Sequence, residues 1–421
     1  MGALQEPHLI PVERALEIVL DNARTLPTEN VDFQDAPGRV LAEDIVSDLD
    51  LPPFPRSAVD GFALRSADVK SPPSQLRVVG VVPAGASPAF HVNGGEAAQV
   101  MTGAPVPEGT DAVQMVEKTR LEGERVEILE AVRSGKNIAP RGDEVKEGDI
   151  VLWKGTRLDA ASVAVAATVG KVKLPVGRRA RLAVIATGDE LVDPASKPGP
   201  GKIRNSNAFS LVAQARCAGA EVRNLGVAKD TEESLRRLIR DGLAGDVLLL
   251  SGGVSMGRFD LVEGVLGELG VRTLFDGVAL KPGKPLVFGI SPGGGLVFGL
   301  PGNPVSTMVT FELFVRPALA KLEGCGEPRR PLLSATLRDS LSSKGARRAF
   351  LPGWIEPEGS GLAAHPIATR GSADIVAFSK ANALLIIPED EERLAAGQTV
   401  QVYPLDRFLF GEDRWHGVRP S

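Results

Sequence analysis

The spacing of hydrophobic residues changes several times along the chain, and each change predicts a different kind of structure. Residues 11–26 carry apolar side chains at helical spacing. Residues 57–148 instead contain short alternating runs separated by Gly, Pro and Asn turns, which predicts a β-rich region. A second helical pattern follows at 159–170. The first half of the chain therefore reads as a β-rich segment between two helical ones.

From residue 181 to about 323, strand-like runs alternate with helical patterns. Strands are predicted at 182–186, 222–227, 247–250, 271–275, 286–290 and 296–300. Helices are predicted at 208–218, 232–243, 261–269 and 305–322. This alternation is typical of a three-layer α/β/α domain with a mixed, mostly parallel sheet. Beyond residue 324 short strands return, at 332–337, 349–354, 383–387 and 399–403, and they predict a small β-barrel or sandwich.

Composition limits the classes of protein to which the chain can belong. The chain has 421 residues, enough for several domains, and a net charge of −5 without a Lys- or Arg-rich run. Nucleic acid is therefore not expected as a partner. Two cysteines exclude a disulfide framework and suit a reducing compartment. No long uncharged apolar run is present, so we expect a cytoplasmic protein without a membrane partner.

Three glycine-rich or acidic turns directly follow predicted strands of the α/β region. They are Thr187-Gly188-Asp189-Glu190, Ser251-Gly252-Gly253-Val254-Ser255-Met256-Gly257 and Pro301-Gly302-Asn303-Pro304. Ligands of open α/β sheets bind at the carboxyl ends of the strands, and glycines let backbone N–H groups approach an anion closely. Each turn alone could be purely structural, but together they predict a site for a phosphate or another oxyanion.

A rigid Lys281-Pro282-Gly283-Lys284 loop precedes the predicted strand 286–290, and its two ammonium groups form a candidate oxyanion site. Both lysines could also be ordinary surface charges. Asp189, Glu190, Asp230 and Asp260 could hold magnesium beside a phosphate, because hard oxygen ligands suit this ion. The four histidines form no pair with metal-ligand spacing, so zinc is not expected.

The β-rich region contains two further unusual blocks, Ser57-Ala58-Val59-Asp60-Gly61-Phe62-Ala63 and Met101-Thr102-Gly103-Ala104-Pro105. Asp60-Gly61 and Thr102-Gly103 each fit a simple turn. The functional interpretation is that Asp60 and Thr102 line a site shared with another domain or subunit.

Read in order, these blocks resemble the molybdopterin molybdenumtransferases, the MoeA-type enzymes of molybdenum cofactor biosynthesis that include the E domain of gephyrin. The matching blocks begin at Ser57, Met101, Thr187, Ser251, Lys281 and Leu300 and span nearly the whole chain. The chain departs from the family pattern mainly near its end, where Arg347-Arg348-Ala349-Phe350 lacks a further arginine and Val376 and Ala377 replace serines.

The resemblance implies four domains. These are a discontinuous elongated domain (1–50 plus 149–178), an inserted β-rich domain (51–148), an α/β molybdopterin-binding domain (179–328) and a C-terminal β-barrel (329–421). It also implies a homodimer, with a cleft between the α/β domain of one subunit and the inserted domain of the other. Contacts with an adenylyltransferase partner and with molybdoenzyme acceptors are further expectations.

The implied reaction inserts molybdate into adenylylated molybdopterin with Mg²⁺, releases AMP and forms Mo-molybdopterin. The resemblance implies catalytic roles for Asp60, Thr102, Glu190, Asp230, Lys281 and Lys284. It implies substrate binding by Thr187, Gly188, Ser251, Gly252, Gly253, Ser255, Pro301, Gly302, Asn303, Pro304, Ser306, Arg347 and Ser372, and magnesium binding by Asp189, Glu190 and Asp260. The alternatives are a molybdopterin adenylyltransferase and a non-catalytic pterin carrier or scaffold.

Overall fold

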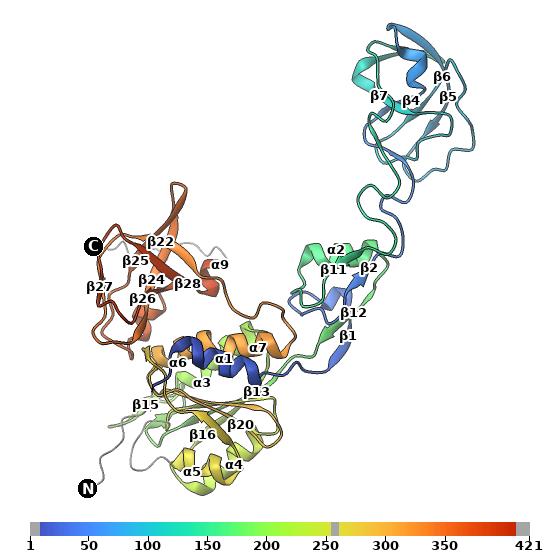
Figure 1. The fold of residues 1–421 in the computed structure, drawn as a ribbon. Helices are drawn as coiled ribbons and strands as arrows, with labels where there is room; N and C mark the ends of the chain where they lie inside the picture. Colours follow the sequence, from blue (N-terminus) through green and yellow to red (C-terminus); the bar gives the residue numbers. More distant parts are fainter. Residues whose placement is uncertain (1–8, 254–260, 410–421) are drawn as a thin grey trace.

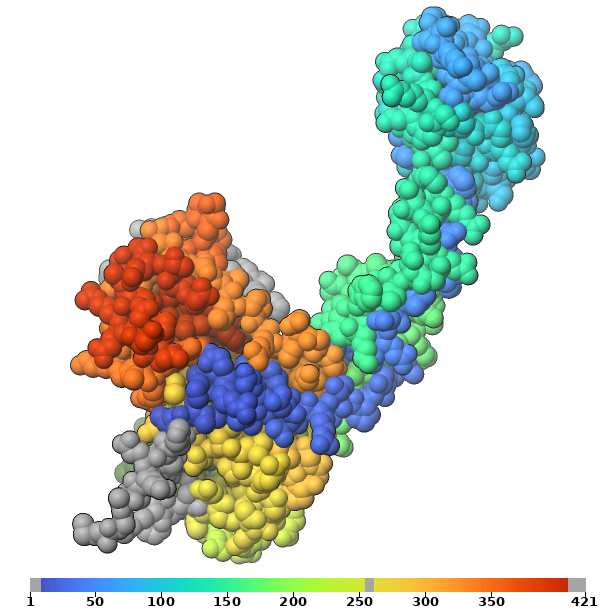
Figure 2. All heavy atoms as spheres, viewed as in Figure 1, coloured from blue at the N-terminus to red at the C-terminus, as the bar shows by residue number. Residues whose placement is uncertain are grey.

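The elongated domain forms an arm between the two ends of the molecule (Figure 1). The computed structural model describes residues 9–253 and 261–409. At one end the α/β domain and a C-terminal barrel lie next to each other, and at the other end lies the inserted β-rich domain. Figure 2 shows that the connection between the elongated domain and the inserted domain is narrow. Among the described residues, no helix combines the length and the apolar composition needed to cross a membrane.

The α/β domain is built on a six-stranded sheet of order β16-β13-β17-β21-β20-β18. The pairings from β16 to β21 are parallel, whereas β20 runs antiparallel to both β21 and β18. The predicted strands are confirmed, with small shifts at their ends. Their bounds are Arg181–Thr187 (β13), Glu221–Ala228 (β16), Val247–Ser251 (β17), Arg272–Phe275 (β18), Val287–Ile290 (β20) and Leu296–Leu300 (β21).

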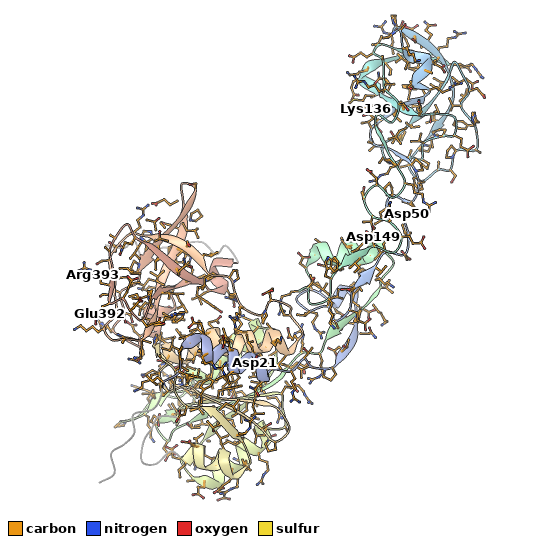
Figure 3. The ribbon with its side chains drawn as sticks, viewed as in Figure 1. Asp21, Asp50, Lys136, Asp149, Glu392 and Arg393 are labelled. Carbon is orange, nitrogen blue, oxygen red and sulfur yellow. The ribbon has the colours of Figure 1, made fainter. Side chains whose placement is uncertain are left out.

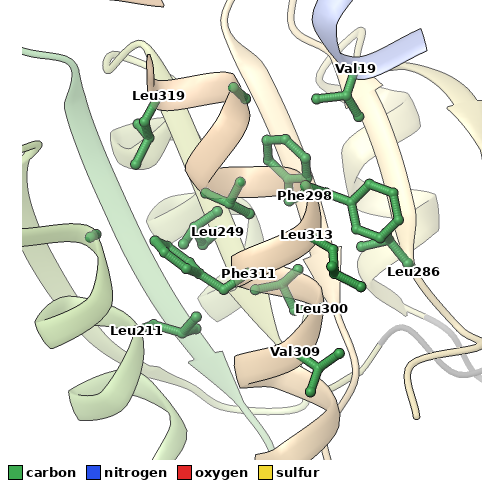
Figure 4. Close-up of a cluster of buried hydrophobic side chains, with 14 of the residues drawn as sticks. Val19, Leu211, Leu249, Leu286, Phe298, Leu300, Val309, Phe311, Leu313 and Leu319 are labelled. Atoms are coloured by element: carbon green, nitrogen blue, oxygen red, sulfur yellow. The ribbon is translucent and has the colours of Figure 1, made fainter. Parts of the chain in front are cut away.

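Both faces of this sheet are buried, which explains its continuous apolar strands. On one face Leu249 packs with helices α3 (Asn207–Cys217) and α6 (Pro304–Thr310), as Figure 4 shows. On the other face its neighbours Leu248 and Leu250 pack with α4 (Glu232–Gly242) and α5 (Leu261–Glu268). Alternate residues of one strand thus serve two separate cores.

Helix α1 (Val12–Asn22) packs with a different domain from the one to which the sequence assigned it. The domain limits inferred above place residues 1–50 with the elongated domain, yet Ala15 and Val19 are fully buried in the core of the α/β domain. The helix is amphipathic, and its apolar stripe covers the helical segment formed by η4 (Phe311–Val315) and α7 (Arg316–Leu322). The first residues of the chain therefore pack with the α/β domain before the chain enters the arm.

The predicted helix 305–322 is interrupted. It consists of α6 (Pro304–Thr310), a π-helical segment η4 (Phe311–Val315) and α7 (Arg316–Leu322). Pro317 accounts for the interruption, because it has no N–H to offer the carbonyl of Leu313 and its ring crowds that carbonyl. The sequence pattern missed this change because the apolar spacing continues through it.

The π-helical segment carries a buried ion cluster that joins the α/β domain to the barrel. The Arg316 Nε donates to the Glu312 carboxylate at 2.6 Å, and its Nη2 donates to Asp406 at 2.8 Å. Arg330 pairs with the same two acids. Burial alone would lower the pKa of Arg316, but attraction to Glu312 and Asp406 raises it above its ordinary value. Arg316 therefore keeps its positive charge in this buried position.

We expect Glu312→Ala to lower the free energy of unfolding by about 3 kcal/mol, because it leaves two buried guanidinium groups with less compensation. Urea unfolding followed by circular dichroism measures the loss. Glu268→Ala is the control, since the Arg236–Glu268 pair lies on the surface, where solvent screens the interaction and the loss should be much smaller. Equal losses in the two variants would contradict this account of the cluster.

The C-terminal region forms the predicted barrel. Five strands close in the order β24-β25-β22-β28-β26, with β26 returning to β24. Strand β25 is the one that the sequence pattern missed, since it is rich in small residues and ends at Pro366. The bounds are Leu333–Leu337 (β22), Arg348–Glu358 (β24), Gly361–Pro366 (β25), Ala383–Ile387 (β26) and Thr399–Pro404 (β28), with β23 (Leu341–Ser342), β27 (Arg393–Leu394), α8 (Ile375–Phe378) and α9 (Asp406–Leu409) outside the closed barrel.

The elongated domain is assembled from two distant segments. Strand β1 (Thr28–Asp32) pairs with β12 (Lys173–Gly177), and β2 (Ile45–Val46) pairs with β11 (Ile150–Leu152). Helix α2 (Ala160–Thr168) covers a small core of its own. Asp50 and Asp149, labelled in Figure 3, mark the points where the chain leaves for the inserted domain and returns from it.

The inserted domain contains a curled sheet of order β7-β4-β6-β5-β9-β8. Its strands are β4 (Gly61–Leu64), β5 (Ser74–Val82), β6 (Glu96–Val100), β7 (Ala112–Met115), β8 (Thr119–Glu122) and β9 (Arg125–Ile128), with β3 (Arg56–Ser57) paired to β10 (Ile138–Ala139). The β-rich character predicted for residues 57–148 is confirmed. Two apolar clusters fill the domain, so its core is separate from that of the α/β domain.

Candidate functional site

The three glycine-bearing turns meet at one edge of the α/β sheet. Strands β13, β17 and β21 are parallel neighbours, and Ser251 at the end of β17 is in register with Ala186 and Leu300. The turns that follow these strands must therefore lie side by side. The loop before β20 reaches the same edge, because β20 is antiparallel to β21 and Val287 pairs with Gly299.

These turns enclose a cavity of about 260 Å³. It is lined by Thr187, Gly188, Glu190, Asp230, Gly252, Gly253, Pro285, Pro301 and Gly302. All but Pro285 are among the residues singled out from the sequence. A larger cavity of about 450 Å³ lies at the opposite edge, beside Arg24 and Arg272, and contains none of the predicted site residues. The smaller cavity is therefore the candidate site.

Glycines are required where the second turn approaches the first. Gly253 has φ +66°, and a Cβ atom there would lie 2.6 Å from the Thr187 Oγ1. A Cβ on Gly252, at φ +89°, would lie 2.8 Å from the Thr187 carbonyl oxygen. Thr187 is 3% exposed, and its hydroxyl has no hydrogen-bond partner among the described residues. A buried hydroxyl without a hydrogen bond costs free energy of folding. A polar ligand in the cavity that Thr187 lines would supply the missing bond.

The acidic residues form one wall of the site. The backbone N–H groups of Asp189 and Asp230 each donate to the other residue's carboxylate at 3.3 Å. Lys202 donates to the Asp189 carbonyl oxygen at 2.7 Å. The Glu190 carboxylate lies against Gly188, where a Cβ would be 2.4 Å from Oε2. This wall presents carboxylate oxygens to the cavity from β13 and β16.

These carboxylates do not by themselves form a metal centre. Within residues 9–253 and 261–409, no group of three His, Cys, Asp or Glu side chains is arranged to hold a metal ion. Asp260, predicted as a magnesium ligand, and Ser255, predicted to bind substrate, lie outside the described residues.

The lysine loop is held by the barrel. Leu280 and Lys281 form strand β19, which pairs with Arg348 and Ala349 of β24. The Lys281 Nζ donates to the Lys344 carbonyl oxygen at 3.1 Å, and the Arg347 Nη1 donates to the Leu280 carbonyl oxygen at 3.1 Å. Arg347 was predicted to bind substrate, but its hydrogen bond in the structure is to the backbone that carries Lys281.

One further contact brings the C-terminal domain to the sheet edge, and the rest of the lysine loop is held within the α/β domain. The Val305 N–H donates to the Ser372 carbonyl oxygen at 3.0 Å, next to the buried Ser306. Lys284 is exposed, and its carbonyl oxygen accepts hydrogen bonds from the N–H groups of Val278 and Leu286 at 3.0 Å each. Asn303 precedes α6 and Pro304 is its first residue. The predicted basic residues are thus gathered at the seam between sheet edge and barrel.

Asp60 and Thr102 lie together, but far from this edge in the same chain. The Asp60 Oδ1 accepts hydrogen bonds from the Thr102 N–H at 2.7 Å and from its Oγ1 at 3.2 Å. Both residues are exposed in the inserted domain at the far end of the arm (Figure 1). One chain therefore contains the pair and the cavity as two separate surfaces.

Sequence reasoning missed two residues that shape the site. Asn207 stands at the start of α3 and bonds to the turns around the cavity, while Lys344 offers the backbone carbonyl that holds Lys281. Asn207 could have been noticed, since it immediately precedes the predicted helix 208–218 on a strand-to-helix connection. Lys344 acts through its backbone, so its side-chain type carries no signal.

Comparison with known proteins agrees with this geometry. Residues 10–170 match the family described as "MoeA N-terminal region (domain I and II)", 183–321 match "Probable molybdopterin binding domain", and 334–405 match "MoeA C-terminal region (domain IV)". Relatives named molybdopterin molybdenumtransferase include one from Nostoc sp., 36% identical over 90% of this chain and 89% of its own. Another, from Bacillus subtilis, is 34% identical over 93% of each chain.

Solved structures agree as well. A molybdopterin biosynthesis MoeA protein from Pyrococcus horikoshii is 34% identical, covers 94% of this chain and 99% of its own, and superposes with a TM-score of 0.81. The identity, the coverage of all four structural regions and the cavity formed by the family's motifs lead to one conclusion. The chain belongs to the MoeA family of molybdopterin molybdenumtransferases, enzymes of molybdenum cofactor biosynthesis.

Proposed function

We propose that this protein inserts molybdate into adenylylated molybdopterin and releases AMP. The observation that carries the proposal is the cavity at the carboxyl edge of the sheet, with acids on one side and the lysine loop beside Pro285 on the other. A substrate with two anionic ends suits this arrangement. The glycine turns accommodate its phosphates, and the ammonium groups of Lys281 and Lys284 attract the molybdate dianion.

The reaction balances without an added oxidant or reductant. The dithiolene sulfurs replace one molybdate oxygen, which leaves as water with the two thiol protons. A water molecule adds across the phosphoanhydride, giving AMP and the pterin phosphate. Lys281 has three N–H donors and uses one on the Lys344 carbonyl oxygen, so two remain for the anion. Glu190 and Asp230 line the cavity, which supports a role for their carboxylates in orienting the attacking water.

We further propose that Asp60 and Thr102 of a second copy complete the site. Two observations support this step. The pair is exposed and distant from the cavity in its own chain. It is also flanked by exposed apolar side chains, Met101 at 45% and Val116 at 43%, which favours burial against another protein surface.

The direct test incubates the purified protein with adenylylated molybdopterin, with and without molybdate, and measures AMP. AMP release that requires molybdate supports the proposal, and AMP release independent of molybdate contradicts it. A parallel assay with molybdopterin and ATP separates the alternatives. Consumption of ATP with molybdopterin indicates an adenylyltransferase, whereas tight pterin binding without any turnover indicates a carrier.

We expect Gly253→Ala to weaken molybdopterin binding by about tenfold or more, because a left-handed backbone and two close contacts force the turn to move. The added Cβ would lie 2.6 Å from the Thr187 Oγ1 and 2.9 Å from the Val262 Cγ2. Equilibrium dialysis with molybdopterin measures the change. Gly264→Ala in α5 is the control, since nothing lies within 4 Å of its added Cβ. Unchanged affinity in Gly253→Ala would show that the turn does not shape the ligand site.

A further inference from the structure

One amide at the start of α3 reaches the ends of two neighbouring strands. The Asn207 Nδ2 donates to the Ser251 Oγ at 2.9 Å and to the Gly302 carbonyl oxygen at 2.7 Å. It also lies 3.4 Å from the Thr307 Oγ1 in α6. A single side chain therefore connects α3, the end of β17 and the turn that follows β21.

The orientation of this amide is fixed by its surroundings. The Gly302 carbonyl can only accept, so the NH₂ group of Asn207 must face it. The Oδ1 is buried and has no hydrogen-bond partner among the described residues. The NH₂ group has two N–H donors and three acceptors within reach, whereas the Oδ1 has no partner among the described residues, so this side chain makes its contacts through its N–H groups.

The bonded turns are the ones that form the cavity. Gly302 lines it together with Gly252, and a Cβ on Gly302 would lie 3.8 Å from the Gly252 Cα. Thr307 extends the network, because its single O–H donor lies within hydrogen-bond distance of the carbonyl oxygens of Pro301 and Asn303. Movement of Asn207 would therefore release both turns at once.

We propose that Asn207 is a positioning residue that holds the Ser251 and Gly302 turns in the arrangement that binds molybdopterin. This inference rests on the proposed function, in which the cavity holds the pterin substrate. It concerns the shape of the free protein: Asn207 preorganises two loops that would otherwise have to be ordered by the ligand.

The same helix offers a matched control. Gln214 lies two turns further along α3, and its Nε2 donates to the Met308 carbonyl oxygen at 3.2 Å and to the Glu312 Oε1 at 2.7 Å. Its Oε1 is likewise buried without a partner among the described residues. Gln214 thus ties α3 to its neighbours with the same chemistry, but these bonds lead away from the cavity turns.

The experiment compares Asn207→Ala, Asn207→Asp and Gln214→Ala by thermal unfolding and by equilibrium dialysis with molybdopterin, at a temperature where all are folded. We expect Asn207→Ala to weaken binding about tenfold, from the loss of two neutral hydrogen bonds. Asn207→Asp should bind at least as weakly, because its carboxylate faces the Gly302 carbonyl. Gln214→Ala should lose thermal stability but retain wild-type affinity.

Each outcome decides between the explanations. Wild-type affinity in Asn207→Ala overturns the inference, and so does an equal loss of affinity in Gln214→Ala, which would indicate a general effect of loosening α3. Asn207→Asp binding like wild type would also overturn it, since the donors would then be unnecessary. If the wild-type protein itself does not bind molybdopterin, the proposed function fails instead, and the two failures are distinguished.

Discussion

Lys281→Ala is expected to reduce molybdate-dependent AMP release by about a thousandfold while leaving the fold intact. Preorganised charges that meet a reacting oxyanion commonly contribute two to three orders of magnitude to the rate. The structure explains why this lysine is preorganised. Its backbone is fixed by pairing of β19 with β24, and its ammonium is held by the Lys344 carbonyl oxygen. The substitution removes one hydrogen bond from an exposed pair of groups, so the melting temperature should change little.

The measurement is a titration of molybdate at saturating adenylylated molybdopterin. A raised molybdate requirement together with a lower maximal rate is the expected pattern, because the lost charge acts on both binding and reaction. Lys173→Ala is the control: it changes the net charge equally, but Lys173 pairs with Asp32 in the elongated domain. A Lys281→Ala enzyme with a wild-type response to molybdate would remove the lysine loop from the site.

The arrangement of the α/β domain can be predicted from sequence because its signals are local. Continuous apolar strands alternate with amphipathic helices. Parallel strands then place the turns that follow their carboxyl ends at one edge of the sheet. That reasoning correctly groups Thr187, Gly252 and Gly302, which all line the cavity. The lysine loop reaches this edge for a different reason: β20 is antiparallel to β21, so β20 begins where β21 ends.

What sequence could not supply depends on contacts between distant segments. The hydrogen bond from Arg347 to the Leu280 carbonyl requires the barrel to dock on the sheet, and no spacing in the chain encodes that docking. The π-helical interruption before Arg316 arises from one proline inside an unbroken apolar pattern. Asn207 donates to the Ser251 Oγ and the Gly302 carbonyl oxygen, acceptors on other elements that only the fold brings within reach.

Asp60→Asn is expected to reduce turnover by about a hundredfold or more without unfolding the inserted domain. The Asp60 Oδ1 accepts two hydrogen bonds from Thr102, and an amide oxygen can replace it there. The variant therefore keeps the local turn and removes only the negative charge. If that charge acts on a bound substrate in the cavity of a second copy, the loss should appear in turnover and not in melting temperature.

A mixed dimer tests whether the charge acts across subunits. Consider a dimer of one Asp60→Asn chain and one Lys281→Ala chain. If each site is shared between copies, one of the two sites combines Lys281 of the first chain with Asp60 of the second and is intact, and the other site contains both defects. Random pairing of the two inactive variants should then restore about a quarter of the wild-type activity, because half of the dimers are mixed and each has one intact site. If Asp60 acts within its own chain, every site contains a defect and no activity returns. Failure of the mixture, with each variant shown to be folded and dimeric, would therefore exclude a site completed by the partner copy.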